Sequence, residues 1–74
     1  MDMRKLVGRN IARNRSKKGL TQERLAEISG FSQQYISGLE RGRRNPTVIT
    51  VYELAKVLGV KPHELLKPYS RTGG

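Results

Sequence analysis

Cysteine and tryptophan are absent from this 74-residue chain, and histidine occurs only once. Without cysteine, the chain has no disulfide and no cysteine-ligated zinc site. The one histidine, His63, has no clustered carboxylates near it in the sequence, so a nucleophile, base and orienting group cannot be assembled around it. We therefore expect a protein that is not an enzyme and that has no catalytic residue, cofactor or metal.

Long apolar runs are also missing, and no segment approaches the ~20 residues that a membrane-spanning helix needs. No apolar stretch resembles the core of a signal peptide. These absences predict a cytoplasmic protein without a membrane partner. Aromatic residues are few, and only Tyr35, Tyr52 and Tyr69 offer rings on which exposed bases could stack, which disfavours RNA as the ligand.

Acidic residues are scarce as well, with 6 of them against 15 lysine and arginine residues, giving a formal net charge of +9. Residues 1–19 carry seven basic side chains and residues 20–40 carry one, while Arg41, Arg43 and Arg44 form a second cluster. Two separated basic patches suit a fold that brings them to one face. An excess of this size is typical of a protein that binds nucleic acid.

The length predicts one small domain, which we place at residues 1–69, followed by a flexible tail at 70–74. Apolar residues recur at helical spacing without β-type alternation or internal repeats, so we expect an all-α protein. Five helices are predicted from their caps and breaking residues. They cover residues 3–17, ended by Gly19; a segment from the N-cap Thr21 to Gly30; a segment that begins at the N-cap Ser32; a segment from the N-cap Thr47 to Gly59; and a short segment between Pro62 and Pro68.

Two of these helices have informative apolar stripes. On the first, Arg15 falls on the stripe formed by Met3, Val7 and Ile11, where a charge needs a partner. The predicted core stripe of the fourth helix consists of Val48, Val51, Leu54, Ala55 and Leu58.

The second and third predicted helices are joined by a short segment that contains Gly30, and such a junction is typical of a helix-turn-helix. On the third helix Ile36 and Leu39 share the inner side, with Glu40 at its edge. The outer side has no apolar residue and consists of Gln33, Gln34, Ser37, Gly38 and Arg41.

The stretch "GLTQERLAEISGFSQQYISGLERGRRNPTV" resembles the helix-turn-helix of the lambda-repressor-like family, also called Cro or Xre type. The resemblance rests on the small Ala26, on Gly30 in the turn, on the inward Ile36 and Leu39, and on "LERG" followed by "NPT". Within the family the chain is similar to controller proteins of restriction–modification systems and to short regulators of phages and mobile elements. The resemblance implies a DNA-binding transcriptional regulator, acting as repressor or activator.

In such a domain the third helix lies in the major groove, and we expect Gln33 and Gln34 to read base edges, because an amide matches the N6/N7 edge of adenine. Ser37 is the next candidate. Gly38 departs from relatives that have a base-reading side chain at this position. Arg44 resembles the position from which controller proteins reach toward the operator centre and its minor groove.

The remaining residues of the expected interface are assigned to phosphates, which fix register without reading sequence. They are Gln22, Ser32, Tyr35, Arg41, Arg43, Asn45 and Thr47. The resemblance also implies that Arg15 pairs with Glu40, which ties the first helix to the third and has an architectural role.

One recognition helix reads too few bases to select a site in a genome, so we expect a homodimer on a palindromic operator. Its predicted interface is the C-terminal segment, through Val60, Leu65, Leu66 and Tyr69. The gene would be autoregulated, and an activating form would also contact RNA polymerase. An alternative is an antitoxin that binds a partner toxin as well as its operator.

Overall fold

The computed structural model describes residues 2–68, which form four α-helices and one 3-10 helix. The elements are α1 (Met3–Lys17), α2 (Gln22–Ser29), α3 (Gln33–Glu40), α4 (Val48–Leu58) and η1 (Pro62–Leu65). No strand occurs among the described residues. The all-α class and the positions of the first four helices are confirmed. The predicted interface residue Tyr69 and the predicted tail at 70–74 lie outside the described residues.

Side-chain caps begin the four α-helices, because the first backbone N–H groups of a helix have no partner within it. The side-chain oxygens of Asp2, Thr21, Ser32 and Thr47 accept these hydrogen bonds at 3.0 Å, from backbone N–H groups two or three residues further on. Gly30 ends α2 in the left-handed region, with φ at +83°, which turns the chain into α3.

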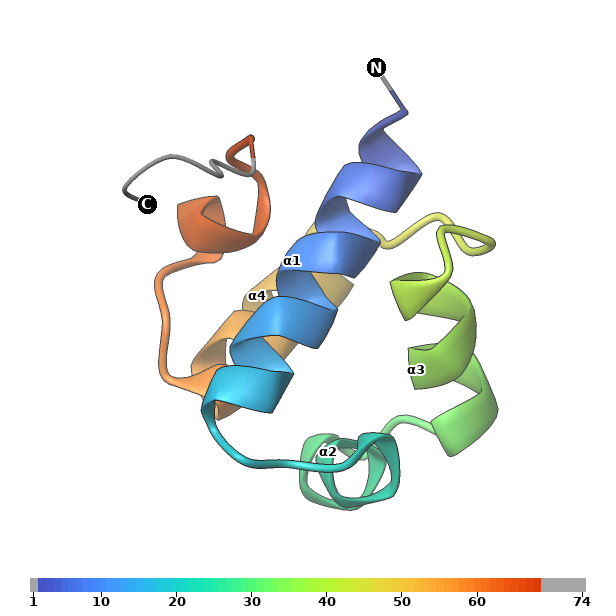
Figure 1. The fold of residues 1–74 in the computed structure, drawn as a ribbon, viewed down its shortest axis with the longest axis vertical. Coiled ribbons are helices and arrows are strands. Elements are labelled where there is room, and N and C mark those ends of the chain that lie inside the picture. The colour runs from blue at the N-terminus through green and yellow to red at the C-terminus, as the bar shows by residue number, and fades with distance from the viewer. Residues whose placement is uncertain (1, 69–74) are drawn as a thin grey trace.

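Helix α1 crosses the middle of the molecule, with α4 behind it, α3 on one side and the C-terminal segment on the other (Figure 1). Gly8 lets α1 approach α3 closely, since a Cβ atom there would lie 2.1 Å from the carbonyl oxygen of Leu39. The core between the helices is apolar. It consists of Val7, Ile11, Leu25, Ala26, Ile36, Leu39, Val51, Leu54, Ala55, Leu58 and Leu65.

The prediction of five α-helices is wrong, because the last segment forms only the short 3-10 helix η1. The backbone N–H of Leu66 donates to the carbonyl of His63, the i→i+3 pattern of a 3-10 turn, at 3.0 Å. The buried Asn10 of α1 then donates from Nδ2 to the carbonyls of Leu65 and Lys67, at 3.0 and 2.8 Å. These carbonyls are therefore held by a side chain of another element.

Two residues assigned to core stripes are at the surface instead. Val48 is 85% exposed and Met3 is 50% exposed, although both lie in their predicted helices. Each occupies the first turn of its helix, where half or more of its surface stays exposed although apolar side chains of the other elements lie near it. The four other residues of the α4 stripe are buried as predicted.

Candidate nucleic-acid interface

The outer face of α3 forms part of one polar hollow on the surface of the protein. Residues from the start of α2, from α3 and from the following loop surround it. They are Gln22, Gln33, Gln34, Ser37, Gly38, Arg41, Arg43 and Arg44. The four residues predicted to read bases therefore lie around the same hollow, and both glutamines of α3 are exposed.

The loop after α3 turns back along the helix. Gly42 has φ at +74°, and the backbone N–H of Arg43 donates to the carbonyl of Gly38 at 2.9 Å. This turn places the guanidinium carbon of Arg44 5.9 Å from the centre of the Tyr35 ring, within the range of a cation–π contact. Arg41 and Arg43 are exposed at the end of α3 and in the loop. The second basic cluster of the sequence thus adjoins the outer face of α3.

The three hydroxyl-bearing residues predicted to contact phosphate already have partners in the protein. The hydroxyl oxygens of Ser32 and Thr47 cap α3 and α4, yet both residues are exposed, so each hydroxyl can still meet a ligand. The hydroxyl of Tyr35 lies 3.1 Å from Oγ1 of Thr50, which is itself 3.1 Å from Oγ1 of Thr47. This chain of hydroxyl groups joins the first turn of α3 to the first turn of α4. Asn45 is exposed just before α4.

The predicted ion pair between Arg15 and Glu40 is confirmed. Nε of Arg15 lies 2.7 Å from Oε2 of Glu40, and its Nη2 donates to Oε1 at 3.1 Å. The Arg15 side chain is 19% exposed and that of Glu40 only 5%. Arg15 also donates to the carbonyl of Leu20 at 2.6 Å. The pair therefore joins α1, the α1–α2 loop and the end of α3.

Gln22 completes this cluster, which the sequence did not indicate. Its Nε2 donates to Oε1 of Glu40 at 2.8 Å. The amide has a second hydrogen, so Gln22 can hold Glu40 and still donate to a ligand in the polar hollow. The carboxylate that supports the fold thus also orients a residue of the expected interface.

The predicted dimer interface is wrong for Leu65, which is fully buried in the core of the monomer and has no surface for a second chain. Val60 is half-buried and packs against the same core. Leu66 is 44% exposed. Of the predicted interface residues that the structure describes, only Leu66 has substantial apolar surface.

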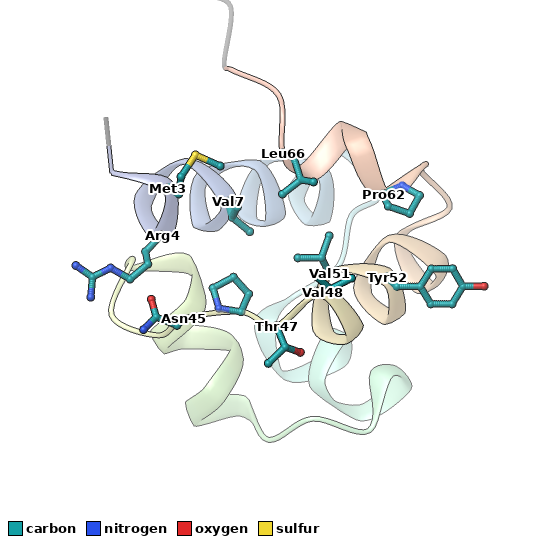
Figure 2. Close-up of a pocket in the computed structure, with 11 residues that line it drawn as sticks. Met3, Arg4, Val7, Asn45, Thr47, Val48, Val51, Tyr52, Pro62 and Leu66 are labelled. Atoms are coloured by element: carbon teal, nitrogen blue, oxygen red, sulfur yellow. The ribbon is translucent and has the colours of Figure 1, made fainter.

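Leu66 lines an apolar hollow between the first turns of α1 and α4 and the C-terminal segment. In Figure 2, Val7 of α1, Val51 of α4 and Leu66 approach one another across this hollow. Its lining is Met3, Arg4, Val7, Asn45, Pro46, Thr47, Val48, Val51, Tyr52, Pro62 and Leu66. Exposed apolar side chains thus gather beside the end of the α3–α4 loop.

Comparison with known proteins decides the family. A family model described as helix-turn-helix, HTH_3, matches residues 11–65 of the chain. The chain belongs to this helix-turn-helix family. It is 68% identical over 72 residues to the uncharacterized HTH-type transcriptional regulator y4dJ of Sinorhizobium fredii, a match that covers 97% of this chain and 94% of that protein.

Two solved structures of helix-turn-helix regulators have the same fold. The restriction–modification controller protein C.AhdI of Aeromonas hydrophila is 39% identical with a TM-score of 0.80, covering 84% of this chain and 94% of that one. The biofilm regulator SinR, solved in complex with DNA, is 34% identical with a TM-score of 0.78, covering 82% of this chain and 98% of that one. The protein is thus a helix-turn-helix transcriptional regulator rather than an enzyme.

Within this helix-turn-helix domain, sequence reasoning missed two buried polar residues, Thr50 beside the interface and Asn10 beneath the C-terminal segment. Thr50 links Tyr35 to Thr47, and its spacing of three residues from a helix cap was the available signal. Asn10 had no such signal, because its partners lie 55 and 57 residues away.

None of the helices among residues 2–68 is long and apolar enough to cross a membrane.

Proposed function

We propose that the protein binds a palindromic operator as a homodimer and regulates its own gene. The observation that carries this proposal is the polar hollow, where amide, hydroxyl and guanidinium groups from α2, α3 and the α3–α4 loop converge. Such groups are the ones that read base edges and grip phosphates. A relative with the same fold, SinR, was solved in complex with DNA, which supports DNA as the ligand.

In this proposal the outer face of α3 enters the major groove, which is wide enough to admit a helix. Gln33 and Gln34 are exposed in the first turn of α3 and can each donate and accept at an adenine edge. Ser37 lies one turn further along the same face. Arg41 and Arg43 at the end of the helix would hold the flanking phosphates and supply affinity for any sequence.

The first turns of α2 and α4 are suited to the DNA backbone on either side of α3. A helix begins with unpaired N–H groups and a positive dipole end, which attract an anion. Gln22 begins α2, and Asn45 and Thr47 precede α4, so polar side chains accompany both helix ends.

We further propose that the apolar hollow is the surface through which two copies pair. Val48 and Tyr52 are 85% and 55% exposed, and with Met3 and Leu66 they gather exposed apolar side chains around one hollow, as at many interaction sites. Asn45 and Pro46 line the hollow, so pairing there would bring the arginine-rich loops of both copies to the dyad.

The size of the monomer fits such an arrangement. Its extents are 32 × 23 × 18 Å, so two paired copies can place their α3 helices about 34 Å apart, one turn of DNA. A formal net charge of +9 on each copy opposes pairing in free solution. DNA neutralises this charge, so we expect the operator to strengthen the dimer.

Selection from a library of random DNA duplexes tests the operator. We expect an enriched motif with two-fold symmetry, and half-sites about one helical turn apart. Enrichment of a single unrepeated half-site would contradict the dimer, and no enrichment would contradict sequence-specific binding. If the gene is autoregulated, the same motif lies upstream of it, and a reporter fused to that promoter responds to the protein.

Sedimentation equilibrium over a range of protein concentrations, with and without the selected duplex, tests the interface. Val48→Glu should abolish pairing without unfolding the monomer, because residue 48 is exposed and a carboxylate is favourable at a helix N-terminus. The matched control is Ile28→Glu, at a 40% exposed apolar position on α2 that does not line the apolar hollow. Pairing that survives Val48→Glu would place the interface elsewhere.

A further inference from the structure

Gly38 has no conformational reason to be glycine. It lies inside the eight-residue helix α3, and its φ is not among the positive values found at four other glycines. Glycine within a helix is unfavourable relative to alanine, so its presence needs another explanation. The available explanation is space, because a Cβ atom at this position would lie 2.9 Å from Cγ and 3.3 Å from Nε of Arg44.

The side chain of Arg44 therefore lies across α3 at the place where residue 38 has none. On its other side the guanidinium faces the Tyr35 ring, at 5.9 Å from the ring centre. Tyr35 is itself held, by its hydroxyl contact with Thr50 and by the Phe31 ring at 5.3 Å between centroids. Arg44 is exposed, and its side chain lies between the Tyr35 ring and the gap that Gly38 leaves in the helix surface.

This position aims Arg44 at the same space as the glutamines of α3. Arg44 lines the polar hollow together with Gln33, Gln34 and Ser37, so a DNA groove that receives the outer face of α3 also lies within reach of Arg44. An arginine offered to the major groove matches the O6 and N7 acceptors of guanine, with two hydrogen bonds. A side chain that already favours this position before binding also loses less conformational freedom in making them.

We propose that Gly38 is a positioning residue for DNA specificity. Its missing side chain lets Arg44 lie along α3 and read the major groove beside Gln33 and Gln34, selecting a guanine. The inference rests on the proposed function, in which α3 enters that groove. It differs from an assignment of Arg44 to phosphate or to the minor groove, and it explains why the base-reading position at residue 38 is empty.

The test uses binding-site selection from random duplexes with the wild type, Gly38→Ala, Arg44→Ala and the double variant. Alanine favours a helix, and the flexible Arg44 can move aside, so Gly38→Ala should fold, which thermal unfolding would verify. We expect both single variants to lose the preference for one guanine in each half-site and to keep the other positions. On the wild-type motif each should bind roughly 5- to 150-fold more weakly, and the double variant no more weakly than Arg44→Ala.

Three outcomes would overturn the inference. If Gly38→Ala selects the same motif as the wild type, residue 38 has no influence on readout. A double variant whose loss is the product of the single losses would show that Gly38 acts on DNA directly, through close approach. Equal weakening of Arg44→Ala on all duplexes would make Arg44 a phosphate contact. If the wild type enriches no motif, the proposed function fails. If the wild type enriches a motif and one of these three outcomes occurs, only the inference about Gly38 fails.

Modified bases determine which groove Arg44 occupies. Replacing the selected guanine by 7-deazaguanine removes an acceptor from the major groove alone, and should weaken the wild type but not Arg44→Ala. Hypoxanthine removes the minor-groove amino group and should leave the wild type unchanged; the reverse pattern would refute major-groove reading. Tyr35→Phe, which keeps the ring, should retain the guanine preference, whereas Tyr35→Leu should weaken it.

Discussion

Arg15→Ala should destabilise the protein strongly, because Arg15 is the main partner of an almost buried carboxylate. The substitution removes two hydrogen bonds to Glu40 and one to the carbonyl of Leu20, and it leaves Glu40 with only the amide of Gln22. Removing one partner of a buried ion pair typically costs ~3–5 kcal/mol. We expect ~3 kcal/mol, because Arg15 is 19% exposed and Gln22 still compensates part of the charge.

A loss of this size is large for so small a domain, whose total stability should be on the order of 4–11 kcal/mol at ~0.05–0.15 kcal/mol per residue. At ~4–8 °C per kcal/mol, the midpoint of thermal unfolding should fall by ~12–24 °C. Glu40→Ala should cost less than Arg15→Ala, since the arginine left behind keeps its bond to the Leu20 carbonyl and can reach water.

Urea unfolding followed by far-ultraviolet circular dichroism at a fixed protein concentration is the appropriate assay, because urea does not screen charges as guanidinium does. The matched control is Arg24→Ala, which removes an exposed ion pair with Glu27 one helical turn away and should cost about 0–0.5 kcal/mol. The Arg15 and Glu40 single variants should lose more in sum than the double variant. Additive losses, or a loss for Arg15→Ala no greater than for Arg24→Ala, would refute the reasoning.

Three other predictions concern the outer face of α3, the arginine loop and the buried Asn10. Gln33→Ala and Gln34→Ala should each weaken operator binding by about 1–3 kcal/mol and leave binding to scrambled DNA nearly unchanged, as gel-shift titrations can measure; equal losses on both duplexes would exclude base reading. Arg43→Ala should reduce the slope of log K against log salt concentration by ~0.9 if it releases one counterion, whereas an unchanged slope would mean that it is only solvated. Asn10→Ala should lower the free energy of unfolding by ~2–4 kcal/mol, because the carbonyls of Leu65 and Lys67 lose their donor. Asn10→Asp should lower it further, because a carboxylate donates to neither carbonyl. A smaller loss for Asn10→Asp than for Asn10→Ala would contradict this account.

The helix boundaries could be predicted because their signals are local. A capping side chain such as Thr21 or Ser32 bonds a backbone N–H three residues away, and glycine at Gly30 or Gly59 supplies the left-handed turn that ends a helix. The pairing of Arg15 with Glu40 was also predictable, because a charge on an apolar stripe needs a partner and the family resemblance implied which residue provides it. The functions assigned to the outer face of α3 and to the arginine loop remain predictions.

The errors at the C-terminal segment have one cause, which is that its surroundings come from distant parts of the chain. Leu65 and Leu66 are adjacent apolar residues, but Leu65 is fully buried and Leu66 is 44% exposed. Asn10 holds the carbonyls on this segment, so a 3-10 turn forms in place of the expected helix. Val48 was assigned to the core by its spacing, yet it is 85% exposed in the first turn of α4.

The sequence by itself determined which segments are helical, the polar outer face of α3 and the excess of positive charge, because these depend on side chains within a turn of one another or on composition alone. Only the tertiary structure decided that Gln22 binds Glu40, that Arg44 lies over the gap at Gly38, and that exposed apolar residues gather beside the α3–α4 loop. Each of these depends on the distance between two elements and on the side chains that the second element presents. The spacing of residues along the first element encodes neither of them.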